Sequence, residues 1–373
     1  QISLDAMSQL QVVTPLAGTP AQRAGLRSDD LISKVDGEAT LGFTLDQAVD
    51  VITGPKGTPV TLTIERPMKD DGEEDRFDVF DVTLERDVID LKSVLGWKRT
   101  GAGDDDWNWF IDRDSCIGYI RLSQFQNGST RDMRRAIRTM KSEGMTGLIL
   151  DLRFNPGGLL DEAVGIVGQF VSQQRVVSIE GADGRVLGTE NTGAGLAPLA
   201  DTPTVVLINE GAASASEIVA GALQDYAERN LVDVVVGQRS FGKGSVQNVW
   251  EMPAAKPTLI KLTTQYYRLP GGRLIHRDRH PDQPLKGVAP DLSVSMLPEQ
   301  ITESARIRRD ADVMALDEFG QAMDPEAEVD PDTLIEDGID VQLHTALLLL
   351  QSRSGSIGSV AVSPANGQMT PVP

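Results

Sequence analysis

The sequence has few of the residues that crosslink a chain, bind metals or hold nucleic acid. Among its 373 residues there is one cysteine, Cys116, so no intrachain disulfide can form. No HExxH pattern or cysteine pair indicates a metal site, and we expect no metal and no other cofactor. The 35 basic residues face 55 acidic ones, and the formal charge of -20 repels phosphate backbones. We therefore expect no nucleic-acid partner.

Long apolar runs are also missing. No run approaches the roughly 18 apolar residues that a membrane helix needs, which predicts no membrane span in this sequence. The first residue is Gln1 rather than Met, and Ile2-Ser3-Leu4 already has the pattern of a strand, so we expect any signal peptide or anchor to lie upstream. Cys116 lies in the apolar run 116–120, where we expect its thiol to be a small core residue.

The sequence divides into three parts, of which the first is residues 1–88. This part alternates short β-rich runs with turns, at 10–13, 31–35 and 60–64. One helix is predicted at 45–52, where apolar residues recur at helical spacing and a Gly-Pro-Lys-Gly sequence follows. The pattern is that of a small, β-rich domain.

The second part, residues 89–299, alternates strands with helices, which is typical of an α/β domain. The third part, residues 300–373, turns acidic, and we expect a solvated linker through Asp340, a short docked helix at 341–351 and a disordered tail. The predicted strands of the second part are 117–122, 147–150, 205–208 and 234–236, and its predicted helices are 130–143, 160–171 and 215–227.

Ser214 stands where a serine nucleophile could be presented. Such a serine needs exposure on a sharp turn, a base within reach and backbone N–H groups for the developing oxyanion. Ser214 directly precedes the predicted helix, where free N–H groups and the helix dipole favour negative charge, and Ala213 and Ala215 leave room for a substrate. The pattern Ser-x-x-Glu is also a capping box, with Glu217 as the reciprocal partner. By itself this motif favours a helix cap over catalysis.

Lys243 is the candidate general base. Gly242 and Gly244 flank it in a loop that follows a predicted strand, and such a lysine can be held close to another backbone, where desolvation favours the neutral amine. Gln247 could orient it, whereas the alternative is an ordinary solvated lysine. Histidine offers less, because His276 and His280 lie in a loop expected to be exposed and His344 is remote in sequence.

A third candidate element follows the predicted strand 147–150. There Asn155-Pro156-Gly157-Gly158 predicts a tight turn with unobstructed backbone N–H groups, as an oxyanion hole requires. Glycine and proline also punctuate ordinary strand-to-helix connections, so the turn alone favours that simpler interpretation.

Together these segments closely resemble the C-terminal processing peptidases, a family of serine peptidases in which a PDZ domain lies beside an α/β core. The resemblance spans about residues 1–297. For the PDZ domain it rests on 20–26, 29–32, 35–37 and 54–60, and for the core on 117–122, 151–153, 155–158, 213–218, 221–225, 241–247 and 287–291.

The resemblance implies a fold, a reaction and the residues of a site. The fold would be an α/β core of crotonase-like type, residues 89–299, with an N-terminal PDZ domain, residues 1–88, that is incomplete at its N-terminus. The reaction would be that of a serine endopeptidase that recognises proteins by their C-terminal tails and forms an acyl-enzyme. The implied roles are nucleophile for Ser214, general base for Lys243, its orienting partner for Gln247, and oxyanion hole for the backbone N–H groups of Gly158 and Ala215.

Two alternatives stay open. One is a catalytically silent PDZ scaffold that binds protein C-termini. The other is an enzyme acting on acyl thioesters, as crotonase-like folds do, although the sequence has no Gly-rich or basic loop to hold a coenzyme phosphate. The resemblance further implies protein or peptide partners and an exported location such as the periplasm, and it leaves an adaptor or an oligomer open.

Three departures from the family pattern matter. Alanine stands at position 212, where the family usually has serine, but that position is not the nucleophile. Extra residues at 227–230 mean that Lys243 can approach Ser214 only if this loop bulges outward. The glycine-containing segment that caps a peptide carboxylate in the family would lie upstream of Gln1.

Overall fold

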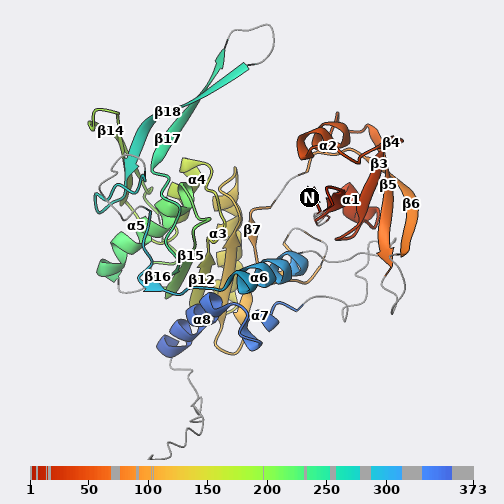
Figure 1. Cartoon of the computed structure of the whole chain (residues 1–373). Coiled ribbons are helices and arrows are strands. Elements are labelled where there is room, and N and C mark those ends of the chain that lie inside the picture. The colour runs from red at the N-terminus through yellow and green to blue at the C-terminus, as the bar shows by residue number, and fades with distance from the viewer. Residues whose placement is uncertain are drawn as a thin grey trace, which may run out of the picture.

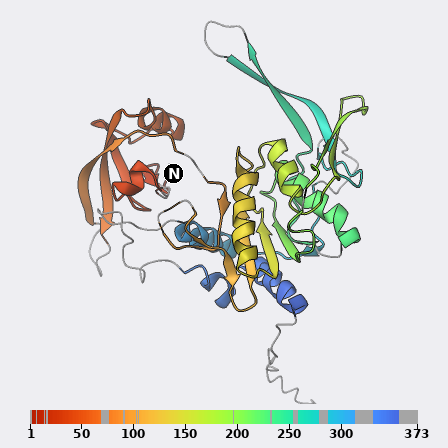
Figure 2. The same cartoon turned by 180° about the vertical axis from the view of Figure 1, so that it is seen from behind.

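The structure is a computed structural model that describes residues 2–5, 7–13, 15, 18–68, 76–89, 92–101, 103, 105–195, 197–230, 233–252, 258–277, 287–312 and 330–354. Figures 1 and 2 show from opposite sides a β-rich N-terminal domain, coloured red to orange, beside a larger α/β core. Each of the two has hydrophobic clusters of its own. No helix within these ranges combines the length and the apolar character needed to cross a membrane.

The N-terminal domain is an antiparallel sheet with two helices. In spatial order its strands are β1 (Ile2–Leu4), β2 (Leu10–Val12), β3 (Leu31–Val35), β5 (Pro59–Met68) and β6 (Arg76–Glu85); β4 (Glu38–Ala39) pairs with β3, and the helices are α1 (Pro20–Arg23) and α2 (Leu45–Ile52). Thr44 and Gln47 form a capping box that starts α2, and Ala48 buries its inner face. The predicted helix and the predicted strands of this part are confirmed.

The core is built on a mostly parallel sheet. Its strands, in spatial order, are β10 (Phe110–Asp112), β11 (Ile117–Leu122), β12 (Gly147–Asp151), β15 (Thr204–Ile208), β16 (Asp233–Gly237) and β19 (Leu292–Ser293), with β7 (Val94–Leu95) paired to β11. From β11 to β19 every pairing is parallel. Strands buried on both faces need helices on both sides, which explains the continuous apolar runs in the sequence.

Alternate residues of these strands face different helical layers. Leu148 and Leu150 belong to a cluster with α3 (Ser129–Ser142), α4 (Leu160–Val167) and α5 (Ala215–Asn230). Ile149 and Val205 belong to a second cluster with α6 (Pro298–Ala311), α7 (Thr333–Glu336) and α8 (Val341–Ser354). Figures 1 and 2 show α6 and α8, in blue, on the side of the sheet away from α4 and α5.

A second, antiparallel sheet lies beside α5. Its strands run in the order β14 (Val186–Asn191), β13 (Arg175–Glu180), β18 (Thr258–Arg268) and β17 (Ser245–Met252), and the last two form a ribbon that projects from the core in Figure 1. A further short pair is formed by β8 (Lys98–Arg99) and β9 (Trp107–Asn108).

Two expectations need correction here. The chain up to Asp340 is not a solvated linker where it is described, because Leu334 and Asp340 are fully buried and α6 to α8 cover one face of the sheet. The apolar residues of that face need this cover, so the predicted short helix is one part of a larger layer.

Cys116 is only partly buried at the edge of the core, where its Sγ lies 3.5 Å from the Arg113 carbonyl. Residues 313–329 and most of the predicted tail, 355–373, lie outside the described residues.

Candidate active site

Ser214 occupies the turn between β15 and α5 in a left-handed conformation. Its φ is 56°, which costs a non-glycine residue roughly 1–2 kcal/mol. The Ser214 N–H donates to Glu217 Oε2 at 2.8 Å, which is the glutamate half of the predicted capping box. The serine half does not form, because Ser214 Oγ has no hydrogen-bond partner among the residues that the structure describes. The helix-cap interpretation therefore leaves this hydroxyl unused.

The lysine loop, residues 238–244, lies directly against this turn. Phe241 N–H donates to the Ala212 carbonyl at 3.0 Å, and Lys243 N–H donates to Glu217 Oε2 at 2.8 Å. On its other side the loop passes close to His276: a Cβ at position 244 would lie 2.9 Å from the His276 backbone nitrogen, so glycine is needed there. The backbones of the Ser214 turn and the lysine loop are thus held together.

Glu217 is the group that joins them. Its carboxylate is fully buried and accepts hydrogen bonds from both turns: from the N–H groups of Ser214, Gly242 and Lys243 at 2.7–2.8 Å, and from Ser240 Oγ at 2.5 Å. Burial raises the pKa of Glu217 above its ordinary value, although these hydrogen bonds oppose the shift. The sequence showed Glu217 only as a helix cap.

Tyr267 on β18 supports the same arrangement from the other side. Its buried hydroxyl lies 3.1 Å from the Ser214 carbonyl oxygen and 2.9 Å from the Lys243 carbonyl oxygen. Burial raises the pKa of Tyr267 well above its usual range, so the phenol stays protonated and acts as a donor. No sequence motif pointed to this residue.

The glycine turn, residues 153–158 after β12, lies close to Ser214. A Cβ at Gly157 would lie 2.7 Å from Ser214 Cβ and 2.9 Å from the Ala215 nitrogen, and a Cβ at Gly158 would lie 2.0 Å from the Phe125 carbonyl oxygen. Their φ angles are 99° and 148°, so both positions require glycine. Within the described part of the chain, the N–H groups of Gly158 and Ala215 donate to no other residue.

Buried polar contacts fix this turn to its neighbours. The Asn155 carbonyl accepts from the Ala213 N–H at 3.0 Å and from Ser216 Oγ at 2.9 Å, while Asn155 Oδ1 accepts from the Gly157 N–H at 2.9 Å. The glycine turn and the Ser214 turn therefore form one connected unit at the carboxyl ends of β12 and β15, the edge where open α/β sheets place their ligands.

The side chains of Lys243 and Gln247 are less closely engaged. Lys243 Nζ has no hydrogen-bond partner among the described residues, and Gln247 is exposed on β17, opposite Thr263. The extra residues at 227–230 continue α5 as a helix, so they do not form the outward loop on which we made the approach of Lys243 depend, yet the backbone of Lys243 still reaches the Ser214 turn through Glu217. His276 is half-buried rather than exposed, with its ring centroid 4.9 Å from that of Tyr266, and His280 lies outside the described residues.

The N-terminal domain offers a second candidate site, for an extended peptide. Among the described strands, β1 is the edge strand of its sheet, and it lies beside α2. Leu45 and Val49, one helical turn apart on α2, are 40% and 41% exposed. An unpaired strand edge next to exposed apolar side chains is the arrangement by which peptides add to a sheet.

Across the described residues, no group of three or more histidine, cysteine or acidic side chains could hold a metal ion.

Comparison with known families finds a match in each of the two domains. Residues 116–294 match Peptidase family S41, and residues 11–66 match a PDZ domain. The chain belongs to peptidase family S41 and carries a PDZ domain in its N-terminal part.

Two of its relatives come from bacteria. A carboxy-terminal-processing protease of Bartonella bacilliformis is 39% identical over 297 residues, which cover 78% of this chain and 60% of that protein. A probable CtpA-like serine protease of Staphylococcus aureus is 35% identical over 288 residues, 77% of this chain and 50% of that protein. The chain thus spans about 60% or less of the length of these relatives. A crystal structure of a putative S41 protease from Bacteroides fragilis shares the fold, with a TM-score of 0.51, 16% identity and coverage of 92% of this chain and 82% of that one.

Proposed function

We propose that this chain is a serine endopeptidase that cleaves proteins recognised through their C-terminal tails. The observation that carries the proposal is the contact between three turns. Among the described residues, the Ser214 hydroxyl and the Gly158 N–H have no hydrogen-bond partner, and Glu217 ties the Ser214 turn to the loop of Lys243. This combination supplies what acyl transfer by a serine requires.

The proposed reaction follows from these positions. The neutral amine of Lys243 takes the proton of Ser214 Oγ as that oxygen attacks the scissile carbonyl, and the N–H groups of Gly158 and Ala215 stabilise the oxyanion. The protonated lysine then donates its proton to the leaving amine, and water hydrolyses the acyl-enzyme with Lys243 again as base. Rotation of the Lys243 side chain brings Nζ to Ser214 Oγ, and Gln247 orients it in that position.

The N-terminal domain would supply the specificity. An extended substrate tail adds as a strand to the free edge of β1, and its apolar C-terminal side chain contacts Leu45 and Val49 on α2. Selection then depends on the tail rather than on the cleaved bond. An exported location such as the periplasm and the crotonase-like type of the core, both implied by the family resemblance, are parts of the same proposal.

Cleavage of an unfolded polypeptide with an apolar C-terminal tail tests the proposal. We expect Ser214→Ala and Lys243→Ala each to lower the cleavage rate by at least about 10³-fold. Ser142→Ala and Lys141→Ala are matched controls. Both residues are exposed at the end of α3, which lies near the amino end of β12, whereas Ser214 lies at the carboxyl end of β15. Binding of the tail without cleavage by wild type would instead favour the silent scaffold, and substrate left intact under every condition would overturn the proposal.

A further inference from the structure

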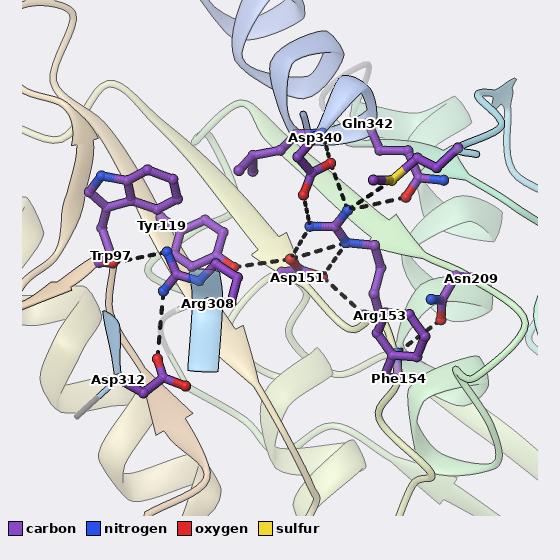
Figure 3. Close-up of polar contacts among 12 residues, drawn as sticks. Trp97, Tyr119, Asp151, Arg153, Phe154, Asn209, Arg308, Asp312, Asp340 and Gln342 are labelled. Carbon is purple, nitrogen blue, oxygen red and sulfur yellow. Dashed lines mark hydrogen bonds and ion pairs between the residues drawn. The ribbon is translucent and has the colours of Figure 1, made fainter. Parts of the chain in front are cut away.

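A buried ion-pair cluster connects the C-terminal helices to the strand that leads into the glycine turn (Figure 3). Arg153 lies between Asp151, at the end of β12, and Asp340, just before α8. Its Nη2 is 2.7 Å from Asp151 Oδ2 and 2.8 Å from Asp340 Oδ2, and its Nη1 is 2.9 Å from Asp340 Oδ1. The side chains of these residues are 8%, 3% and 0% exposed. Arg153 is therefore held at both ends of its guanidinium.

Asp340 is itself fixed by its own segment. Its Oδ1 accepts from the Leu343 N–H at 3.0 Å, and its carbonyl accepts from the His344 N–H at 2.9 Å, so it caps α8. Gln342 adds a further contact, because its Oε1 is 3.2 Å from Arg153 Nη1 and its Nε2 donates to the Val294 carbonyl at 2.7 Å. The start of α8 is thus an ordered support for the guanidinium.

Arg153 begins the turn that faces Ser214. The next residue, Phe154, has a φ of 59°, and its N–H donates to Asn209 Oδ1 at 2.9 Å. Three residues after Phe154 the chain reaches Gly157 and Gly158. A left-handed non-glycine residue persists only where its surroundings fix it, and here the supports are Asn209 on one side and the anchored Arg153 on the other.

We propose that Asp340 is a positioning residue for the active site: through Arg153 it fixes the turn that presents the Gly158 N–H to the reacting carbonyl. This inference rests on the proposed function. It extends the site to a segment beyond residue 294, where the match to the peptidase family ends. The C-terminal helices then do more than cover the sheet, because they complete the oxyanion hole.

Two variants of the C-terminal segment separate positioning from simple docking. Asp340→Asn keeps an oxygen for the Leu343 N–H but removes the charge and one of the bonds to Arg153. Asp332→Asn is the matched control, because Asp332 also ties this segment to the core, through Trp97 Nε1 at 2.7 Å, yet does not touch Arg153. We expect Asp340→Asn to lower kcat for the tailed polypeptide by about tenfold or more, with KM within about twofold of wild type. Asp332→Asn should leave kcat within about twofold of wild type.

Each result decides the question. A kcat at the wild-type level in folded Asp340→Asn would overturn the inference, as would an equal loss in both variants, since that would reduce Asp340 to a docking contact. Should Asp340→Asn fail to fold, Gln342→Leu takes its place, because it removes a neutral bond to the same guanidinium. A fall in its kcat of about threefold or more supports the inference, because a small displacement of a catalytic group lowers the rate. An unchanged kcat overturns it.

The test also distinguishes this inference from the proposed function. If wild type leaves the polypeptide intact, the proposed function fails and the inference fails with it. If wild type cleaves and folded Asp340→Asn cleaves equally fast, only the role of Asp340 is lost.

Discussion

The Ser214 turn and the glycine turn are each held by a buried acid, and the two acids work differently. Glu217 holds the first turn through neutral donors, three backbone N–H groups and one hydroxyl. Asp151 leads into the second turn and is bonded to the guanidinium of Arg153 and to the Tyr119 hydroxyl. Glu217 is thus held by hydrogen bonds from neutral donors, and Asp151 mainly by its ion pair with Arg153.

The pKa values of the two acids reflect this difference. Burial is the largest influence on each and raises the pKa of both. For Glu217 the hydrogen bonds do not overcome burial, so its pKa is raised. For Asp151 the charge and hydrogen bonds of Arg153 do overcome it, so its pKa is lowered. The Ser214 turn is therefore fixed by a carboxylate that accepts neutral hydrogen bonds, and the glycine turn by an ion pair.

The largest effect should come from removing the carboxylate of Glu217. Glu217→Gln keeps the volume but turns an NH₂ group toward backbone N–H donors. We expect kcat to fall by about 100-fold or more, because the Ser214 turn and the lysine loop lose their common anchor. The free energy of unfolding should fall by about 2 kcal/mol, because buried donors lose their partner. Steady-state cleavage and urea unfolding measure the two losses.

Asp291→Asn is the control for this variant. Asp291 also accepts from a backbone N–H, that of Val235 at 2.8 Å, and from Gln224 Nε2 at 2.6 Å, but it contacts neither turn. We expect a loss of stability with kcat near wild type. Equal kcat losses in Glu217→Gln and Asp291→Asn would show that Glu217 acts only through general stability.

A smaller effect is expected at the phenol that supports the same pair of turns. Tyr267→Phe removes the hydroxyl near the Ser214 and Lys243 carbonyl oxygens and should cost about 1 kcal/mol of stability and about tenfold in kcat. Tyr226→Phe is matched to it, because that hydroxyl donates to the Arg175 carbonyl at 2.6 Å, away from the two turns. The comparison fails if both variants keep wild-type kcat.

Much of the framework could be predicted because its signals are local. The bounds of α2 follow from apolar spacing and a cap, and the core strands follow from short apolar runs buried on both faces. Ser214, the glycine turn and the lysine loop were each singled out by the residues that flank them, but their roles were implied only by the family resemblance. Their meeting in one place depends on parallel strands ending at a common edge, which the alternation of strands and helices also predicts.

The supports of the site could not be predicted in this way. Tyr267 lies 53 positions from Ser214, and Asp340 lies 187 positions from Arg153, so no local pattern links either pair. Asp340 also stands in an acidic stretch whose composition is typical of solvated chain, and only tertiary packing reveals that it is buried. Glu217 was visible as a cap, but its bonds to the lysine loop, 25 and 26 positions away, were not.

The smallest expected effect is the pH dependence of stability, and it tests the comparison of Glu217 with Asp151 most directly. The contributions of the two acids to the free energy of unfolding should change with pH in opposite directions. The raised pKa of Glu217 means that its stabilising contribution is present below its ordinary value of 4.5 and is lost as pH rises through the folded-state pKa. The lowered pKa of Asp151 means that its contribution is present above 3.8 and is lost as pH falls through the folded-state pKa.

Urea unfolding from about pH 3 to about pH 7 can therefore separate the two anchors. The free energy of wild type minus that of Glu217→Gln should rise as pH falls toward 4.5, because the folded state binds the proton more tightly than the unfolded chain does. Wild type minus Asp151→Asn should fall as pH drops below 3.8, because there the unfolded chain takes up the proton first. Slopes of the same sign would contradict the distinction, since both acids would then be held by charge or both by neutral donors.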